Sequence, residues 1–180
     1  ACRNNCAIAR CGDGLRRIDI GPLEEGYEAC DDGDEDNTDL CTNDCAVARC
    51  GDGIRRTDIA PGDDAYEACD DGNNANIDGC LNTCEVATCG DGHRYADVEE
   101  CDDGNAWETD GCLSNCAIAR CGDGAIHAGH ETCDDGNLDN DDACTARCEN
   151  ARCGDGFVQT GVEPCDDGND NERDACRSGC

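Results

Sequence analysis

Acidic residues recur at fixed distances from a cysteine in five stretches of this sequence, one of which is "CDDGNNANIDGC" at residues 69–80. Counted from the first cysteine, Asp stands at +1, +2 and +9, Gly at +3, Asp or Asn at +4, and Asn or Glu at +7. A Glu precedes the cysteine by two residues, and a further Asp lies in an upstream CGDG motif. Carboxylate and amide oxygens spaced in this way suit a hard cation, and calcium takes roughly six to eight of them in a flexible geometry.

These positions predict a Ca²⁺ site in each stretch. The loop is not an EF-hand, because the closing Glu and the central Gly of that motif are missing. Asn in place of Asp at +4 keeps a carbonyl oxygen and drops a charge, which a metal ligand tolerates. The predicted ligands are Asp13, Glu28, Asp31, Asp32, Asp34, Asn37 and Asp39; Asp52, Glu67, Asp70, Asp71, Asn73, Asn76 and Asp78; Asp91, Glu99, Asp102, Asp103, Asn105, Glu108 and Asp110; Asp123, Glu131, Asp134, Asp135, Asn137, Asn140 and Asp142; and Asp155, Glu163, Asp166, Asp167, Asn169, Glu172 and Asp174.

A simpler interpretation of the same acids is that they form solvated turns, since Asp and Asn favour turns and acidic loops keep secreted proteins soluble. That interpretation explains acids in general. It does not explain why the same offsets carry acids in all five stretches while the residue at +5 varies among Glu, Asn, Ala, Leu and Asp.

The charge balance limits the possible partners. The chain has 44 Asp and Glu against 13 basic residues, all of them arginine, and its formal net charge is −31. Nucleic acid and anionic membrane surfaces both require a basic face, so neither is expected as a partner. No apolar run approaches the roughly 18 residues that a membrane-spanning helix needs, so membrane insertion is not expected either.

The cysteine content indicates how so polar a chain can fold. There are 22 cysteines in 180 residues, and aromatic residues make up only 3%. Such a composition is typical of disorder unless disulfides replace the missing apolar core. Zinc is the competing use of cysteine, but the chain has few histidines and an acidic character. We therefore predict disulfides, an oxidising compartment, and an extracellular or cell-surface location.

The elements that position these residues are tandem repeats. CGDG begins at residues 11, 50, 89, 121 and 153, CDDG begins at residues 30, 69, 101, 133 and 165, and two further cysteines follow each CDDG cysteine at +11 and +15. The predicted organisation is the tail of a preceding repeat at 1–10, then repeats at 11–49, 50–88, 89–120, 121–152 and 153–180. The first two repeats carry seven additional residues before CDDG.

We predict a small disulfide-rich repeat array with little regular secondary structure, a minimal hydrophobic core and an extended, rod-like architecture. One short β-hairpin is expected around each GDG turn, and a single helical turn is expected at "LCTNDC" and "GCLSNC". Ile8, Val47, Val86 and Ile118 share one repeat position and are expected to cover a disulfide. Four cysteines per repeat leave three pairings open, but a Cys41–Cys45 pair is unfavourable because residues four apart on a helical turn are too distant.

The pattern CGDG…ExCDDGN…DGC…C resembles the Myxococcus cysteine-rich repeat, a disulfide-repeat family of unknown function in bacterial secreted and surface proteins. The resemblance covers essentially the whole chain, and "CDDGNNANIDGC", "CDDGNAWETDGC" and "CDDGNLDNDDAC" carry it most closely. The first repeat departs from the pattern with Asp34 and Leu40. The resemblance implies an extracellular bacterial repeat and implies no activity.

Two functions remain open, and an enzyme is not expected, because no catalytic constellation is present. His127 and His130 beside Glu131 hint at zinc, but in one repeat only. The first function is a structural subunit of a filament or stalk that contacts copies of itself end to end, because the chain opens and closes at the same phase of the repeat. Inter-unit disulfides would then involve Cys2, Cys6, Cys176 and Cys180. The second is a calcium-dependent adhesive or spacer ectodomain that presents Trp107, or the loops at 15–29 and 54–68, to a glycan or protein.

Overall fold

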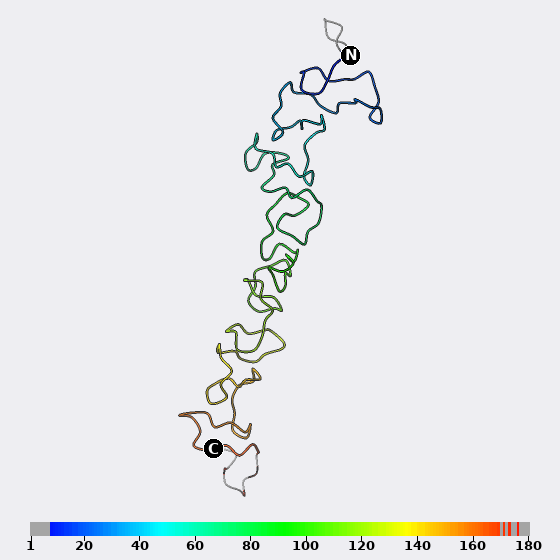
Figure 1. Ribbon diagram of the computed structural model, residues 1–180. Helices are drawn as coiled ribbons and strands as arrows, with labels where there is room; N and C mark the ends of the chain where they lie inside the picture. Colours follow the sequence, from blue (N-terminus) through cyan, green and yellow to red (C-terminus); the bar gives the residue numbers. More distant parts are fainter. Residues whose placement is uncertain (1–7, 170, 172, 174–175, 177–180) are drawn as a thin grey trace. The chain divides into compact units, whose positions relative to one another are not determined.

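The computed structural model describes residues 8–169, 171, 173 and 176, and the chain divides into two compact units, Ala1–Thr88 and Cys89–Cys180. The division falls where the third repeat was predicted to begin. Throughout the described residues the chain consists of turns and loops, with no helix and with only isolated β-bridges (Figure 1). The predicted disulfide-rich repeat fold with little regular structure is confirmed.

Two disulfides that follow one scheme close each of the first four repeats, and one bridge of the same scheme is described in the fifth. The CGDG cysteine bonds to the last cysteine of its repeat, and the CDDG cysteine bonds to the cysteine at +11. Each bridge restricts the unfolded chain and stabilises the fold by about 2–4 kcal/mol, which replaces part of the missing core. The first class comprises Cys11–Cys45, Cys50–Cys84, Cys89–Cys116 and Cys121–Cys148, and the second comprises Cys30–Cys41, Cys69–Cys80, Cys101–Cys112, Cys133–Cys144 and Cys165–Cys176.

This scheme settles two predictions about cysteine. Cys41 and Cys45 bond to different partners, so the exclusion of that pair is confirmed. The prediction that Cys176 takes part in an inter-unit bridge is wrong, because Cys176 is already bonded to Cys165 of the same repeat. Cys2, Cys6 and Cys180 lie outside the described residues.

The hairpin of each repeat lies around its last two cysteines. Cys41 and Val47 form an antiparallel bridge, flanked by hydrogen bonds from Thr42 N to Ala46 O and from Ala48 N to Leu40 O, both 3.0 Å. The predicted position around the GDG turn is therefore wrong. At the predicted helical turn a single turn forms, in which Cys45 N donates to Thr42 O at 2.7 Å and Cys45 itself takes the left-handed conformation that ends the turn. The bridge recurs at Cys80–Val86, Cys112–Ile118 and Cys144–Asn150, and the left-handed cysteines are Cys45, Cys84, Cys116 and Cys148.

Burial is concentrated in the cysteines, in the residues of this hairpin, and in a few polar side chains such as Glu28, Glu67 and Arg56. The residue after the third cysteine is buried in each repeat from the first to the fourth. Val47, by contrast, is 42% exposed, and Ile8 is 64% exposed, so the predicted covering of a disulfide at that position is wrong. The hairpin turns the adjacent Ala48 inward instead, at 5% exposure. The buried residues after the third cysteine are Thr42, Leu81, Leu113 and Thr145.

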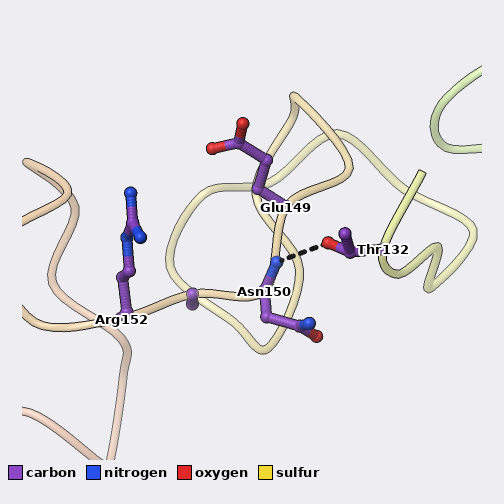
Figure 2. Close-up of a pocket in the computed structure, with 5 residues that line it drawn as sticks. Thr132, Glu149, Asn150 and Arg152 are labelled. Carbon is purple, nitrogen blue, oxygen red and sulfur yellow. Dashed lines mark hydrogen bonds between the residues drawn. The ribbon is translucent and has the colours of Figure 1, made fainter. Parts of the chain in front are cut away.

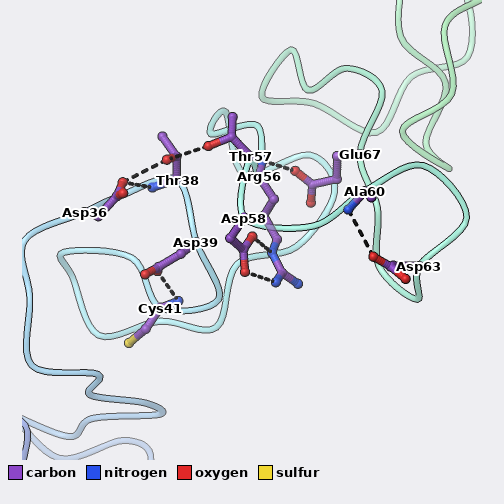
Figure 3. Close-up of polar contacts among 10 residues, drawn as sticks. All are labelled: Asp36, Thr38, Asp39, Cys41, Arg56, Thr57, Asp58, Ala60, Asp63 and Glu67. Atoms are coloured by element: carbon purple, nitrogen blue, oxygen red, sulfur yellow. Dashed lines mark hydrogen bonds and ion pairs between the residues drawn. The ribbon is translucent and has the colours of Figure 1, made fainter.

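One backbone hydrogen bond recurs between successive repeats within each unit. In the first unit, Thr57 N donates to Thr38 O at 2.7 Å, and the two threonine hydroxyls lie 3.0 Å apart (Figure 3). The donor is seven residues after a CGDG cysteine, and the acceptor is eight residues after the CDDG cysteine of the preceding repeat. The same positions join Ala128 N to Thr109 O at 2.8 Å and Thr160 N to Asp141 O at 2.6 Å in the second unit. We call this contact the joint.

Because every described disulfide lies within one repeat, trypsin should separate repeats without reduction. Arg49, Arg120 and Arg152 are exposed and immediately precede a CGDG cysteine, so cleavage after them breaks the chain between closed repeats. Mass spectrometry of a non-reducing digest should show residues 50–120 and 121–152 as separate disulfide-linked species. Fragments that cross these sites and come apart only after reduction would contradict the disulfide scheme.

Candidate metal centre

The Asp at +1 of each CDDG motif holds the two turns of its repeat together. Asp70 accepts the N–H of Gly51 on Oδ2 at 2.7 Å, and the N–H groups of Gly53 and Gly72 on Oδ1 at 2.7 and 2.8 Å. Gly51 has φ +84°, and a Cβ there would lie 2.7 Å from Asn73 O, so only glycine fits. We call this carboxylate and its amide donors the clasp. The equivalent clasp residues are Asp31, Asp102, Asp134 and Asp166.

The clasp changes the acidity of its carboxylate. Burial raises the pKa of Asp102, but the backbone N–H groups of Gly104, Gly90, Gly92 and Asp91 together outweigh burial and hold that pKa below its usual range. The same balance lowers the pKa of Asp134 and of Asp166. The carboxylates of Asp102, Asp134 and Asp166 are therefore ionised at neutral pH, and their oxygens already accept several hydrogen bonds.

Two further predicted ligand positions also serve the backbone. The CGDG aspartate Asp52 accepts Arg49 N at 2.9 Å and Ile54 N at 3.0 Å, which shapes the turn around the motif. Glu67, two residues before CDDG, is 3% exposed and accepts Arg56 N at 2.8 Å. Equivalent bonds recur at the CGDG aspartates Asp13, Asp91, Asp123 and Asp155 and at the glutamates Glu28, Glu99 and Glu131. Glu163 differs, because its buried Oε2 has no hydrogen-bond partner in the part of the chain that the structure describes.

The residue at +7 caps the turn that ends the repeat. Asn76 Oδ1 accepts Asn82 N at 2.7 Å, and Glu108 accepts the hydroxyl of Ser114. Asn37 and Asn140 make the same bond as Asn76, to Asn43 N and Ala146 N. Glu172 and Asp174 lie outside the described residues. These side chains therefore have a structural role that accounts for their fixed position.

The positions at +2, +4 and +9 are the ones that converge. In the first repeat, Asp32, Asp34 and Asp39 each bring a carboxylate oxygen to within 4.8 Å of the others. In the second and fourth repeats, Asn replaces Asp at +4, and its Nδ2 donates to the Asp at +9: Asn73 to Asp78 and Asn137 to Asp142, both at 3.0 Å.

The Asn at +4 does not offer its carbonyl oxygen to the cluster. Asn73 Oδ1 accepts Ala75 N at 2.6 Å, and Asn105 Oδ1 accepts Trp107 N at 2.8 Å. The sequence argument that Asn keeps a ligand oxygen in place of Asp is therefore wrong here, because that oxygen is bonded to the backbone. In the second and fourth repeats the amide nitrogen donates a hydrogen bond to the carboxylate at +9, and in the first repeat Asp34 replaces that donor with a third carboxylate.

The pKa of two of these carboxyl groups is raised by burial and by the negative charge of their neighbours. The N–H of Cys41 lowers the pKa of Asp39, but burial and the negative charges of Asp32 and Asp34 outweigh it and raise the pKa overall. In the fourth repeat, burial and a hydrogen bond with Asp142 raise the pKa of Asp135. A bound cation would relieve this repulsion, most strongly in the first repeat, where no amide donor is present.

Mixed groups of two cysteines and an aspartate also cluster, for example Cys50, Asp70 and Cys84, but their sulfurs form disulfides and cannot ligate a metal. His127 and His130 stack with ring centroids 4.2 Å apart. Sequence reasoning missed the clasp, although the paired glycines of GDG are a signal for a turn whose N–H groups bind an anion.

Comparison with known families supports the repeat interpretation. Residues 113–149 and 145–180 match a domain of unknown function, DUF4215. This match and the disulfide scheme fit a cysteine-rich repeat family. No curated protein and no solved structure matches the chain. Among the described residues no helix is long and apolar enough to span a membrane. The many disulfides indicate an oxidising environment.

Proposed function

We propose that the chain is a structural subunit of an extracellular filament or stalk that is stabilised by disulfides and by Ca²⁺. The joint is the observation that carries this proposal. The same donor and acceptor positions meet at Thr38–Thr57, Thr109–Ala128 and Asp141–Thr160, even though the repeats differ in length. A contact of one geometry that recurs from repeat to repeat is the basis of a quasi-one-dimensional array.

The disulfide scheme supports the same function. Each repeat is locked within itself, so an array gains length by adding repeats and needs no larger core. Contact between copies of this chain, end to end, would be heterologous and non-closing, which is the geometry of a filament. Secretion to a bacterial surface belongs to this proposal and follows from the resemblance to the Myxococcus cysteine-rich repeat.

The calcium part of the proposal centres on Asp32, Asp34 and Asp39. Three carboxylates within 4.8 Å without an amide donor form the strongest cation site among the described residues. Calcium suits them better than magnesium, because exposed, flexible loops can supply oxygens at irregular angles while magnesium requires near-octahedral geometry. The other repeats stay as weaker predicted sites, because Asn at +4 leaves them with one carboxylate fewer.

Electron microscopy of the native, non-reduced protein in calcium tests the proposal. We expect filaments with a uniform axial repeat, which shorten or dissolve when calcium is removed by chelation and reform when it is restored. Magnesium at equal concentration is the matched control and should not restore them. Separate, non-associating particles at high protein concentration in calcium would rule out the filament.

A further inference from the structure

The first two repeats each carry a surface pocket with the same lining. One has a volume of ≈ 470 Å³ and is lined by Arg10, Tyr27 and Asp44, and the other has a volume of ≈ 200 Å³ and is lined by Arg49, Tyr66 and Thr83. In both, the cystine between the CGDG cysteine and the last cysteine forms part of the wall. Both pockets lie in the first unit, and both use the longer loops of these repeats.

A turn that occurs in every repeat places the tyrosines. Four residues before CDDG the chain takes a positive φ, 77° at Gly26 and 61° at Ala65, and the next residue closes the turn through its N–H. Tyr27 N donates to Glu24 O at 3.1 Å, and Tyr66 N donates to Asp63 O at 3.2 Å. The same turn position holds Val98, His130 and Val162 in the other repeats. The tyrosines are therefore particular to the two pockets and are not required by the turn.

Arg10 and Arg49 have no ion-pair partner among the described residues, whereas Arg17, which also lines the first pocket, lies 3.8 Å from Asp19. Arg10 and Arg49 are exposed, although the chain contains 44 acidic residues. The equivalent Arg120 pairs with Glu100 at 2.9 Å, and the residue equivalent to Glu100 opposite Arg49 is Ala29. The phenol hydroxyls of Tyr27 and Tyr66 also make no hydrogen bond with the described residues.

The fourth repeat provides a contrast. Its pocket of ≈ 380 Å³ is lined by Thr132, Glu149, Asn150 and Arg152 and has no aromatic side chain (Figure 2). Asn150 N there donates to the hydroxyl of Thr132 at 3.2 Å. An arginine therefore lines a pocket in the first, second and fourth repeats, and in the first two of these pockets a tyrosine lies beside it.

We propose that the Tyr27 and Tyr66 pockets bind neutral sugar residues of a polysaccharide. A pyranose ring offers a C–H face that packs on an aromatic ring, and hydroxyls that bond to arginine and to Asp44 or Thr83. Binding pockets typically combine an aromatic surface with a few polar groups in this way. A net charge of −31 disfavours an anionic polymer, and the pocket arginines disfavour a cationic one.

Two sites with an equivalent tyrosine and arginine in one unit favour a ligand that repeats. When two sites engage the same polymer, the second binding event is intramolecular and raises the overall affinity by about 10²–10⁴ without new contacts. Loss of one tyrosine should therefore weaken binding to a polysaccharide far more than binding to a single sugar. This inference does not depend on whether the chain forms a filament.

Affinity electrophoresis of the full, non-reduced chain tests it, with dextran, yeast mannan, galactomannan and a soluble β-glucan as probes. At least one of these neutral polymers should retard the protein. Tyr27→Ala or Tyr66→Ala should reduce the retardation at least tenfold in apparent affinity, and the double variant should abolish it. Val98→Ala and Val162→Ala, at the same turn position, are matched controls and should bind normally.

Three results would overturn the inference. The first is no retardation by any of the four polymers. The second is retardation that the double tyrosine variant leaves unchanged. The third is stronger retardation by the anionic polymer alginate than by every neutral polymer. Absence of free thiols in each variant establishes that its disulfides have formed, so a folding failure is recognised separately from a loss of binding.

Discussion

Asp134→Asn is expected to open the fourth repeat locally although its disulfides stay intact. Asp134 accepts Gly122 N at 2.6 Å, Gly124 N at 2.7 Å and Gly136 N at 2.8 Å, and all three bonds go to a charged acceptor. Asn removes the charge and turns an N–H₂ group toward N–H donors. Charged hydrogen bonds contribute about 1.5–3 kcal/mol each, so the local opening free energy should fall by about 2–4 kcal/mol. Amide hydrogen exchange at the three glycines measures this change.

Asp135→Asn is the matched control, because it removes the same charge from the adjacent, exposed residue. The pH dependence of amide hydrogen exchange provides a second measurement. The clasp lowers the pKa of Asp134, so its stabilisation is complete above the ordinary Asp pKa of 3.8 and is lost as the pH falls through the lowered value. Glycine amides in the native protein should exchange faster below that range, whereas Asp134→Asn should show no such step. Equal protection in both variants at neutral pH would refute the clasp.

The repeat architecture could be predicted because cysteine spacing and glycine positions constrain a chain with almost no core. The disulfide scheme could not be predicted in full, because two pairings per repeat remain once the pair equivalent to Cys41–Cys45 is excluded. The predicted position of the hairpin was wrong for a related reason. Cys41 and Val47 pair because the Cys30–Cys41 and Cys11–Cys45 bridges fix both sides of a short turn, and no local propensity signals this.

An acid that recurs at a fixed offset can be a metal ligand or a hydrogen-bond acceptor for the backbone, and the recurrence does not distinguish the two. Asp70 and Glu67 hold their positions because backbone N–H groups of the same repeat need them, and the requirement recurs wherever the turns recur. The informative signal was the variation at +4. At Asn73 and Asn137 the amide bonds to the Asp at +9, so Asp34 marks a repeat without that donor, and this is where we propose that a cation binds.

Exchange of Asp and Asn at +4 should move the cation site between repeats. Asp34→Asn supplies the missing amide donor, removes one of three carboxylates, and should lower calcium affinity of the first repeat about tenfold to a hundredfold, since ligand charge sets affinity in such loops. Isothermal titration calorimetry should then show the loss of the tightest site. Asn105→Asp should create the equivalent cluster with Asp103 and Asp110 in the third repeat.

Trp107 allows the cation site that Asn105→Asp should create to be detected by luminescence. Its backbone N–H bonds to Asn105 Oδ1 at 2.8 Å, so the indole belongs to the same loop and can sensitise a terbium ion bound there. Terbium luminescence excited through Trp107 should rise in Asn105→Asp and fall when calcium competes. Ala106→Asp adds the same charge next to Trp107 outside the cluster and should leave luminescence low. Equal luminescence in the two variants would mean that charge alone attracts the ion, and the positions at +2, +4 and +9 would then have no special role in binding it.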